Sequence, residues 1–493
     1  MFKNSLVSFA CQLVILALGM IIPRILMVGY GSDTNGLTNT VTQIFTYMSL
    51  LGAGIGQATQ NSLYKYLGDD DRKGISLVMS AARRYYRRVS LIYGILIIVV
   101  SAVLPYVINS DVPAFTIFLY VAFGGATSLI ALYFTSLWIV FLNASGKGYI
   151  SNIITLFGRI LLYAVIILLS LNMVDIAYIQ IGSFLVSLIP LTIYYLYMKK
   201  HYSWIDYRQA SGDEKLPDRN SYVIMEVSWT VFSSTDMIIL SAFISTKMAS
   251  VYATYSMVFA ALETLIDGVY YSVKYLLGYT FHNDRKEYAK IHDIFNSAFV
   301  GGTVILLSVC YWLIIPFVRL YTNGVEDVNY VMTWVPLCFC IVKLLSRSRM
   351  VAGNLGNIAG YAKPIGYLSL LEAALNILLS VLLVRRFGIY GVLFATAAAL
   401  VIKVVYVNYL AEKKIINRKS TGTIGIFLAN YAVFALTVFL QHKNPLSIDS
   451  PGEFIISGVI LMCIYVPVGF AVNLLADRSF GSAVKDCIER RPA

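Results

Sequence analysis

The chain has 493 residues, of which 58% are hydrophobic and only 13% are charged. This charged fraction is about half that of an ordinary soluble domain, so the composition excludes a soluble globular protein. A helix needs about 20 mostly apolar residues to cross a bilayer, and such stretches recur along the whole chain. We therefore expect an all-α, polytopic membrane protein with little chain left for a soluble domain.

Apolar segments of spanning length follow one another from the N-terminus onward. The first continues through Pro23 and Arg24 without a small-residue cleavage site, so we expect a retained helix rather than a signal peptide. We predict about fourteen transmembrane helices. Their predicted ranges are 6–29, 37–63, 89–108, 115–141, 150–171, 176–197, 222–244, 251–276, 295–318, 331–345, 365–384, 389–410, 424–441 and 454–475.

The formal net charge of +12 is distributed unevenly across the predicted topology. Counting helices from a cytoplasmic N-terminus places most of the 38 Lys and Arg residues on the cytoplasmic side. The positive-inside rule then predicts that both termini are cytoplasmic. The basic run RRYYRR, Arg83 to Arg88, is expected to lie near anionic headgroups, and we expect no nucleic-acid partner.

The longest polar connection, residues 199–221, separates six predicted helices from eight. Across it, Asp71-Arg72-Lys73 matches Asp284-Arg285-Lys286 at a spacing of 213, and Asn143–Gly146 matches Asn357–Gly360 at a spacing of 214. The common offset predicts a parallel repeat. The predicted domains are a six-helix lobe at 1–198, a cytoplasmic linker at 199–221, a second six-helix lobe at 222–411, helices 13 and 14 at 412–475, and a cytoplasmic tail at 476–493.

A few basic side chains fall within predicted helices, where each needs a route to the interface or a partner inside the protein. Lys274 and Lys343 lie close to helix ends and are expected to snorkel, whereas Lys403 is more central and stays ambiguous. Arg159 lies near the centre of its helix, so we expect it in a polar cavity. For Arg24, snorkelling and a cavity are equally open, although the preceding proline frees a carbonyl that needs protein or water.

Acidic side chains also fall within predicted helices, namely Glu226, Asp236, Glu263, Asp267 and Glu372. Glu263 and Asp267 are four residues apart and share one helix face, where repulsion favours protonation or cation binding. Two interpretations stay open for these acids: pairing with buried Lys and Arg, or a coupling site for an ion or proton. The buried arginines lie in the first half of the chain and most of the acids in the second.

The sequence gives little support for an enzyme. The predicted outside loops have about a dozen residues at most, and no nucleotide-binding P-loop occurs. The six cysteines contain no CxxC pair, and the four histidines fall in predicted loops, where we expect solvated side chains. We therefore expect no catalytic residues, no metal and no cofactor.

Two regions of the chain carry the motifs of one family. Residues 23–58 contain the proline-arginine step, a glycine after the helix and a leucine-glycine-rich end. Residues 321–330 and 352–396 contain a glycine-bearing loop, the Glu372-Ala-x-x-Asn376 helix and a Gly-Ile-x-Gly sequence. These motifs resemble bacterial polysaccharide flippases, the Wzx-like branch of the multidrug/oligosaccharidyl-lipid/polysaccharide exporter superfamily.

The resemblance implies two six-helix lobes around a central cavity, two trailing helices and alternating access. It implies a multi-pass protein of the bacterial cytoplasmic membrane that flips undecaprenyl-diphosphate-linked oligosaccharide to the outer leaflet. Expected partners are this polyprenyl-diphosphate oligosaccharide, membrane lipid, and polysaccharide polymerase and glycosyltransferases of the same pathway. The candidate residues are Arg24 and Arg159 for the diphosphate, Lys274 and Lys403 as further cavity residues, and Asp236, Glu263, Asp267 and Glu372 for a coupling ion or proton.

Rival interpretations stay open within and beyond this superfamily. A lipid II flippase would also use cavity arginines. A multidrug or cation antiporter would typically bind its substrate through acids in the first lobe, where this chain has arginines. From a different class, a membrane polysaccharide polymerase or ligase is disfavoured by the short outside loops.

Overall fold

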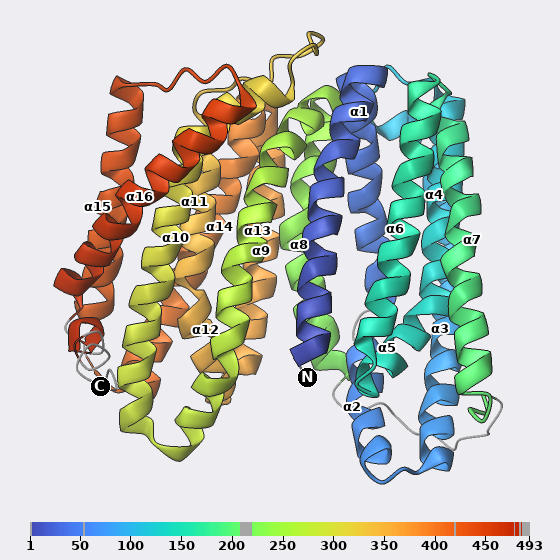
Figure 1. Ribbon diagram of the computed structural model, residues 1–493, viewed down its shortest axis with the longest axis horizontal. Coiled ribbons are helices and arrows are strands. Elements are labelled where there is room, and N and C mark those ends of the chain that lie inside the picture. Colours follow the sequence, from blue (N-terminus) through green and yellow to red (C-terminus); the bar gives the residue numbers. More distant parts are fainter. Residues whose placement is uncertain are drawn as a thin grey trace. The chain divides into compact units, whose positions relative to one another are not determined.

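The computed structural model describes residues 2–52, 55–207, 219–418, 421–477, 479–482 and 485. Across these residues the regular structure is helical, as the composition predicts (Figure 1). Within them, ten helices are long and apolar enough to cross a membrane, and a shorter apolar helix covers Thr230–Phe243. The chain is thus an all-helical, multi-pass membrane protein, and the total of about fourteen spans stays a prediction.

The helices form two compact units, Met1–Ser250 and Val251–Ala493. The first contains α1 (Phe2–Ser49), the 3-10 helix η1 (Leu50–Gly52), α2 (Ile55–Gly68), α3 (Arg72–Val107), α4 (Ala114–Ile130), the π-helix η2 (Ala131–Thr135), α5 (Ser136–Ala144), α6 (Gly148–Leu171), α7 (Ile176–His201) and α8 (Arg219–Phe243). The boundary falls inside α9 (Thr246–Asn283). The second unit continues with α10 (Arg285–Tyr321), α11 (Val335–Ser348), α12 (Met350–Ile358), α13 (Ala362–Phe387), α14 (Ile389–Tyr409), the π-helix η3 (Leu410–Ile415), α15 (Thr421–Lys443) and α16 (Pro451–Ala476).

The predicted linker at 199–221 is described in part. Residues 199–201 are the end of α7, and residues 202–207 pack against α3 and α5, while residues 208–218 lie outside the described part of the chain. The predicted tail from residue 476 is likewise described only at its start and at a few further positions. The predicted lobe boundaries stay predictions; by its contacts, α8 belongs with the first unit.

The predicted first outside loop is a kink in the structure. We expected a break between helices at 6–29 and 37–63, and α1 does consist of two helical segments that meet at a kink, where Gly31 leaves helical geometry with φ 83° and ψ 169°. Glycine has no Cβ and adopts this positive φ without a steric penalty, so the chain bends and the helix resumes. The expected second helix is instead interrupted after Ser49, where η1 follows and α2 starts at Ile55.

Two helices start earlier than the sequence predicts. We expected starts at residues 89 and 295, but α3 begins at Arg72 and α10 at Arg285. An aspartate caps each helix. The Asp71 carboxylate accepts bonds of 3.0 and 3.1 Å from backbone N–H groups of the first turn of α3, and Asp284 does the same in α10 at 2.8 and 3.1 Å. The basic run Arg83 to Arg88 therefore lies within a helix.

The second sequence match also has one local structure in both units. Asn143–Gly146 and Asn357–Gly360 each close a helix with a turn whose glycine has a positive φ, 72° at Gly146 and 88° at Gly360. In both turns the residue after the glycine donates its backbone N–H to a carbonyl five residues earlier, at 2.8 Å. The matches that predicted a repeat thus mark equivalent turns, one in each unit.

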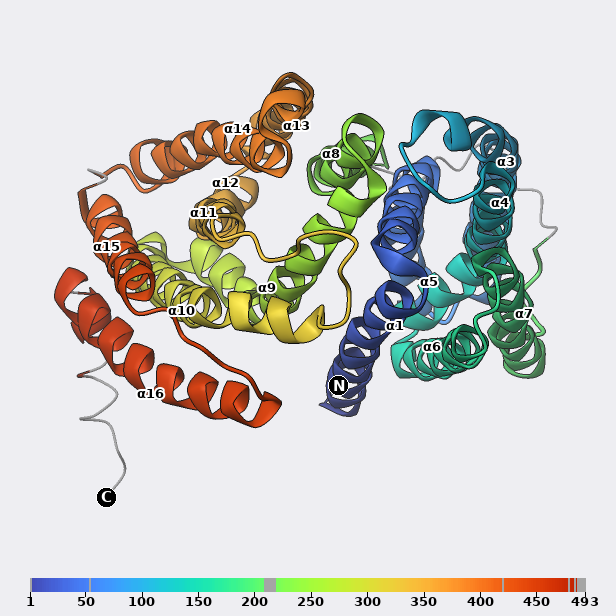
Figure 2. The ribbon, with the colours of Figure 1, turned by 90° about the horizontal axis from the view of Figure 1, so that it is seen from above.

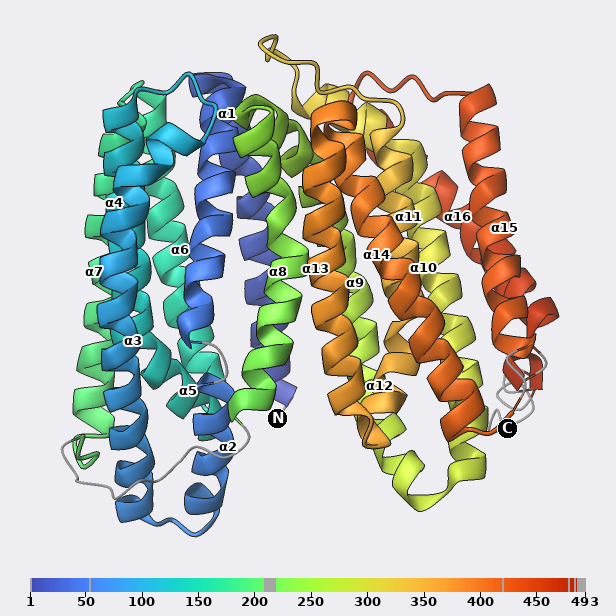
Figure 3. The same ribbon diagram turned by 180° about the vertical axis from the view of Figure 1, so that it is seen from behind.

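In the second unit, α15 and α16 pack against α10, and α13 lies beside α14 (Figures 2 and 3). Polar contacts join α16 to α10. The Ser297 hydroxyl donates to the Asp477 carboxylate at 2.6 Å, and the Trp312 indole N–H donates to the Tyr465 hydroxyl at 2.9 Å. Because lipid tails offer no hydrogen bonds, such contacts help to hold membrane helices together.

Candidate functional site

An open pocket of about 500 Å³ lies inside the first unit. Its walls come from α1, α3, α4, η2, α5, α6 and α7, all of which belong to that unit. Arg159 on α6 is the charged residue of the lining, which otherwise consists of hydroxyl-bearing, aromatic, amide and small apolar side chains. The sequence places Arg159 in a polar cavity, and in the structure it lines this one.

Close packing between α6 and α7 positions Arg159. A Cβ added to Gly158 would lie 3.0 Å from the Pro190 ring, so the preceding glycine allows the two helices to approach. Within the part of the chain that the structure describes, no hydrogen bond or ion pair joins Arg159 to another residue. The guanidinium is therefore available to a ligand in the pocket.

Six serine and threonine hydroxyl groups line the same pocket, and each donates its proton to a backbone carbonyl three to five residues earlier in the chain. They belong to Thr42, Thr46, Ser49, Thr127, Ser128 and Ser136. A hydroxyl whose proton is used in this way keeps its oxygen lone pairs. The pocket thus combines one strong cationic donor with neutral acceptor oxygens.

The helix that forms one wall is irregular at the pocket. The π-helix η2 separates α4 from α5, and Ala131 and Leu132 within it line the pocket. Such π segments in otherwise α-helical spans occur often at functional sites. On α4, a Cβ added to Gly124 would lie 2.9 Å from the Phe45 ring and 3.3 Å from the Gln180 amide nitrogen. A glycine is therefore needed at this narrow point.

Several charged side chains of the second unit form ion pairs with one another. Glu263 on α9 accepts from Lys343 at 2.9 Å and lies 2.7 Å from the Arg347 guanidinium. Asp267, one turn further along α9, pairs with the same Arg347. The two acids do share one helix face, as their spacing predicts, and their neighbours on α11 are cations. Their role as a coupling site stays a prediction.

A second set of pairs surrounds Glu372 on α13. Its side chain is 3% exposed and lies 3.1 Å from the Arg349 guanidinium and 2.7 Å from Lys403 Nζ. Lys403 also donates to the Ser369 hydroxyl at 2.7 Å. Two cations thus share one buried carboxylate, which satisfies the requirement that a buried charge be paired.

Sequence reasoning missed Arg347 and Arg349. The predicted helix 331–345 ended before both, which assigned them to a loop. In the structure α11 extends to Ser348 and α12 begins at Met350, so Arg347 lies in α11, Arg349 lies at the junction of the two helices, and both are buried. The signal available in the sequence was the spacing: basic residues at 343 and 347 match acids at 263 and 267, four residues apart in each case.

The other predicted site residues lie apart from the pocket. Arg24 follows Pro23 in α1 with an exposed side chain and is not among the pocket's lining residues. Lys274 is exposed on α9, and Asp236 is buried on α8 with 4% exposure. The side chain of Glu226 lies outside the described residues. Substrate and coupling roles of these residues stay predictions.

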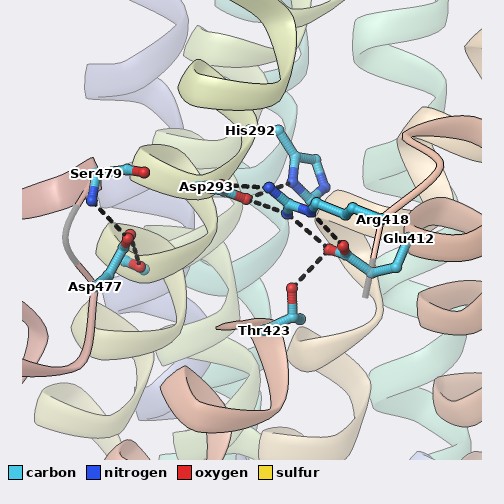
Figure 4. A network of polar contacts seen from close by, with 8 residues as sticks. His292, Asp293, Glu412, Arg418, Thr423, Asp477 and Ser479 are labelled. Carbon is cyan, nitrogen blue, oxygen red and sulfur yellow. Dashed lines mark hydrogen bonds and ion pairs between the residues drawn. The ribbon is translucent and has the colours of Figure 1, made fainter. Parts of the chain in front are cut away.

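A polar cluster joins η3 and the segment that follows it to α10 and α15 (Figure 4). The Arg418 guanidinium donates to both oxygens of Asp293, at 2.5 and 2.6 Å, and to both oxygens of Glu412, at 2.5 and 2.9 Å. The Thr423 hydroxyl donates to Glu412 at 2.6 Å. These bonds, with Glu412 first, raise the pKa of Arg418 above its already high value. Arg418 is therefore permanently charged.

His292 belongs to this cluster, which corrects one expectation. We expected the four histidines in solvated loops, but all four lie in helices, and His292 on α10 is 1% exposed. Its ring and the Asp293 and Glu412 carboxylates have ligand atoms within 4.8 Å of one another, as a metal site requires. Since Arg418 binds the oxygens of both carboxylates, the geometry is that of an ion-pair cluster.

Comparisons with known proteins identify the fold. No protein-family model matches the sequence, and no curated protein matches it in sequence. Solved structures do match. The lipid II flippase MurJ, in an inward closed conformation, aligns over 96% of this chain and 99% of its own at TM-score 0.70 and 13% identity.

Two further structures align with most of their own length. An inward-facing multidrug resistance MATE family transporter of the MOP superfamily aligns over 82% of this chain and 98% of its own, at TM-score 0.65 and 13% identity. A MOP superfamily transporter from Pyrococcus furiosus aligns over 85% of this chain and 95% of its own, at TM-score 0.60 and 10% identity. The chain therefore has the fold of MOP superfamily transporters, which confirms at the level of the fold the resemblance seen in residues 23–58 and 352–396.

Proposed function

We propose that the protein flips undecaprenyl-diphosphate-linked oligosaccharide from the inner to the outer leaflet of the bacterial cytoplasmic membrane by alternating access. The observation that carries this proposal is the pocket of the first unit, where Arg159 shares the lining with six hydroxyl oxygens. The fold supports a transporter, because a lipid II flippase has it over nearly its whole length. No step of this proposal requires an enzyme activity.

The pocket has chemistry for two parts of such a headgroup. A guanidinium donates charge-assisted hydrogen bonds to phosphate oxygens. At 4 Å and an effective dielectric constant of 20, its attraction to one phosphate charge is about 4 kcal/mol. The hydroxyl oxygens are acceptors, and sugar hydroxyl groups are the donors that match them. The polyprenyl chain remains in the lipid, where its apolar surface is most stable.

Arg24 is the second residue that we propose for the diphosphate, with Lys274 and Lys403 as further cavity residues. The chemical reason is the same for all three, since each carries a positive charge within an apolar helix. For coupling to an ion or proton gradient we propose the acids Asp236, Glu263, Asp267 and Glu372. Reconstituted flipping at full rate, with gradients and membrane potential collapsed, would exclude coupling through these acids.

Two alternatives make different predictions. A lipid II flippase is compatible with the same fold and pocket. It would differ from the proposed oligosaccharide flippase in the glycan of its cargo. A multidrug or cation antiporter is less well supported, because the charged group of the described pocket lining is the cation Arg159. A polymerase or ligase has no support from the described geometry.

The decisive experiment is depletion of the protein in its native host, followed by extraction of lipid-linked intermediates. We expect a polyprenyl-diphosphate oligosaccharide to accumulate and its glycan to identify the cargo. Accumulation of lipid II would assign the protein as a lipid II flippase, and drug extrusion without any intermediate would assign an antiporter. Complementation with Thr42→Val/Thr46→Val, which removes two acceptor oxygens at constant size, should restore export only in part.

A further inference from the structure

Four arginines are exposed on α3 just outside its apolar part. They are Arg83, Arg84, Arg87 and Arg88, and we call them the basic face. The 36-residue helix α3 becomes apolar from Val89 onward. At 1.5 Å per residue, the roughly 19 residues to its end span about 28 Å, which matches the hydrocarbon core. The basic face therefore lies at the level of the lipid headgroups.

The same side of α3 is exposed and apolar further along the helix. Steps of three or four residues lead from Arg84 and Arg88 to Leu91, Ile95 and Ile98, whose exposed fractions are 66%, 63% and 70%. Residues at this spacing share one side of a helix. In a membrane, exposed aliphatic side chains of a spanning helix contact lipid tails. The basic face is thus the polar end of a lipid-facing strip.

The equivalent positions of the second unit are covered by α16. Counted from the two capping aspartates, Arg84 corresponds to Ser297 of α10 and Arg88 to Gly301. The Ser297 hydroxyl donates to the carboxylate that follows α16, at 2.6 Å, and a Cβ on Gly301 would lie 2.2 Å from the amide nitrogen of Asn473 on α16. Small residues permit this close helix contact, whereas two arginines would prevent it. The first unit thus has an exposed, charged surface at the positions where the second unit has an internal helix contact.

Residues 202–207 support the basic face from one side. The Arg83 guanidinium lies 4.9 Å from the centre of the Tyr207 ring, and the carbonyl of Tyr207 accepts from the Ser80 hydroxyl at 3.1 Å. Aromatic rings beside Lys or Arg are typical of the membrane interface, where one end of the side chain is apolar and the other hydrated.

We propose that the basic face binds the headgroups of anionic phospholipids, with phosphate oxygens accepting from Arg84 and Arg88. The continuity with the exposed aliphatic strip favours a lipid over an acidic soluble protein, because a lipid satisfies the charges and the apolar side chains together. The site is separate from the pocket that contains Arg159. Its occupancy does not depend on which cargo the protein flips.

The test compares lipid binding by the full-length protein and three variants. Native mass spectrometry in detergent would measure retention of phosphatidylglycerol against phosphatidylcholine. We expect Arg84→Gln/Arg88→Gln to weaken phosphatidylglycerol binding on the order of 30-fold, since each basic side chain at an anionic surface contributes about fivefold. Arg84→Lys/Arg88→Lys keeps the charge and should lose much less. A matched control, Arg72→Gln/Lys73→Gln, removes two exposed charges from the same helix about 24 Å before its apolar part, beyond the reach of the surface potential, and should bind as the wild type does.

A second measurement separates binding from folding. In nanodiscs of phosphatidylcholine with phosphatidylglycerol, the wild type should unfold at a higher temperature than in phosphatidylcholine alone, and Arg84→Gln/Arg88→Gln should not. Equal retention of both lipids by the wild type, or equal losses in the test and control variants, would overturn the proposal. So would an acidic protein that requires Arg84 and Arg88 for binding while phosphatidylglycerol has no effect.

Discussion

Helix α6 of the first unit and helix α13 of the second carry opposite charges in the same turn. Both helices follow equivalent glycine turns, and Arg159 is the twelfth residue of α6 whereas Glu372 is the eleventh of α13. Arg159 lines an open pocket and pairs with none of the described residues. Glu372 is buried between Arg349 and Lys403. The same turn of two corresponding helices thus carries a charge that lines a pocket in one unit and a charge held in ion pairs in the other.

This difference separates two uses of charge within a membrane. A paired charge such as Glu372 stabilises the fold only while its partners are present, since an unpaired ion in an apolar region is costly. A charge beside an open polar pocket can be hydrated and can exchange water for a ligand. Loss of Glu372 should therefore reduce stability, and loss of Arg159 should reduce transport.

The largest expected effect is on transport by Arg159→Ala. Losing an attraction of about 4 kcal/mol for a phosphate charge should lower export of the lipid-linked cargo by at least a hundredfold. Surface polysaccharide in a depleted host complemented with the variant measures this effect, with membrane levels of the protein checked by immunoblot. Arg24→Ala should have a similar effect.

The matched variant is Arg159→Lys, which keeps the charge but loses the planar pair of donors and should export at an intermediate level. Normal export by a well-expressed Arg159→Ala protein would show that the pocket does not bind the diphosphate. The free energy of unfolding of Arg159→Ala should stay within about 0.5 kcal/mol of the wild type, since no described contact is lost.

The second effect is on stability, through Glu372→Gln. Removing the carboxylate leaves Arg349 and Lys403 without their common counter-charge, so we expect the free energy of unfolding to fall by about 3 to 5 kcal/mol. Unfolding in detergent micelles, followed by circular dichroism, measures the change. Glu372→Gln combined with Lys403→Met should recover part of the loss, because one cation fewer remains unpaired. Wild-type stability in the single variant would contradict the difference between the two units.

A smaller effect is expected at Gly124, which lines the pocket on α4. Gly124→Ala adds a methyl group 2.9 Å from the Phe45 ring, and overpacking of this kind costs about 1 to 3 kcal/mol. We expect reduced stability together with reduced export. Gly124→Ala/Phe45→Leu should restore both, because the smaller side chain makes room for the methyl group. Export that stays low while stability returns would indicate that Phe45 itself contacts the cargo.

The smallest effects test the equivalence of the two units. Asp71→Ala and Asp284→Ala each remove a carboxylate that caps a helix, at a cost of about 1 kcal/mol. Asparagine at either position should retain most of the stability because it also caps helices. Similar losses in the two alanine variants would support the repeat. A loss confined to one of them would show that the two caps are not equivalent.

The sequence predicted the main features of the fold and part of the site. Runs of apolar residues indicated the spanning helices, and the matched Asp-Arg-Lys and Asn-x-x-Gly segments have the same local structure in both units. The central position of Arg159 in an apolar helix indicated a polar cavity, because no interface was within reach. The break between the first two helices was predicted, but it is a kink at Gly31 and shorter than the expected loop, since a polar glycine-rich segment is also typical of a loop.

The ion pairs could not be predicted in detail. Arg347 and Arg349 were assigned to a loop because basic and small polar residues commonly end a membrane helix. His292 was expected in solvent for the same reason, although α10 extends past it and buries it. Helix α10 starts early because the adjacent Asp284 caps it, whereas Arg347 of α11 is paired with Glu263 and Asp267 of α9.

The sequence by itself determined that this chain is a helical membrane protein with an internal repeat and isolated charges in apolar helices. These properties are local, since they depend on hydrophobicity, helix caps and turn residues along the chain. Only the tertiary structure decided which charges are paired and which line a pocket. Glu372 pairs with partners from α14 and from the junction of α11 and α12, while Arg159 lines a pocket together with hydroxyl groups of α1, α4 and α5. Such contacts arise from helices far apart in the sequence, and their spacing along the chain does not specify them.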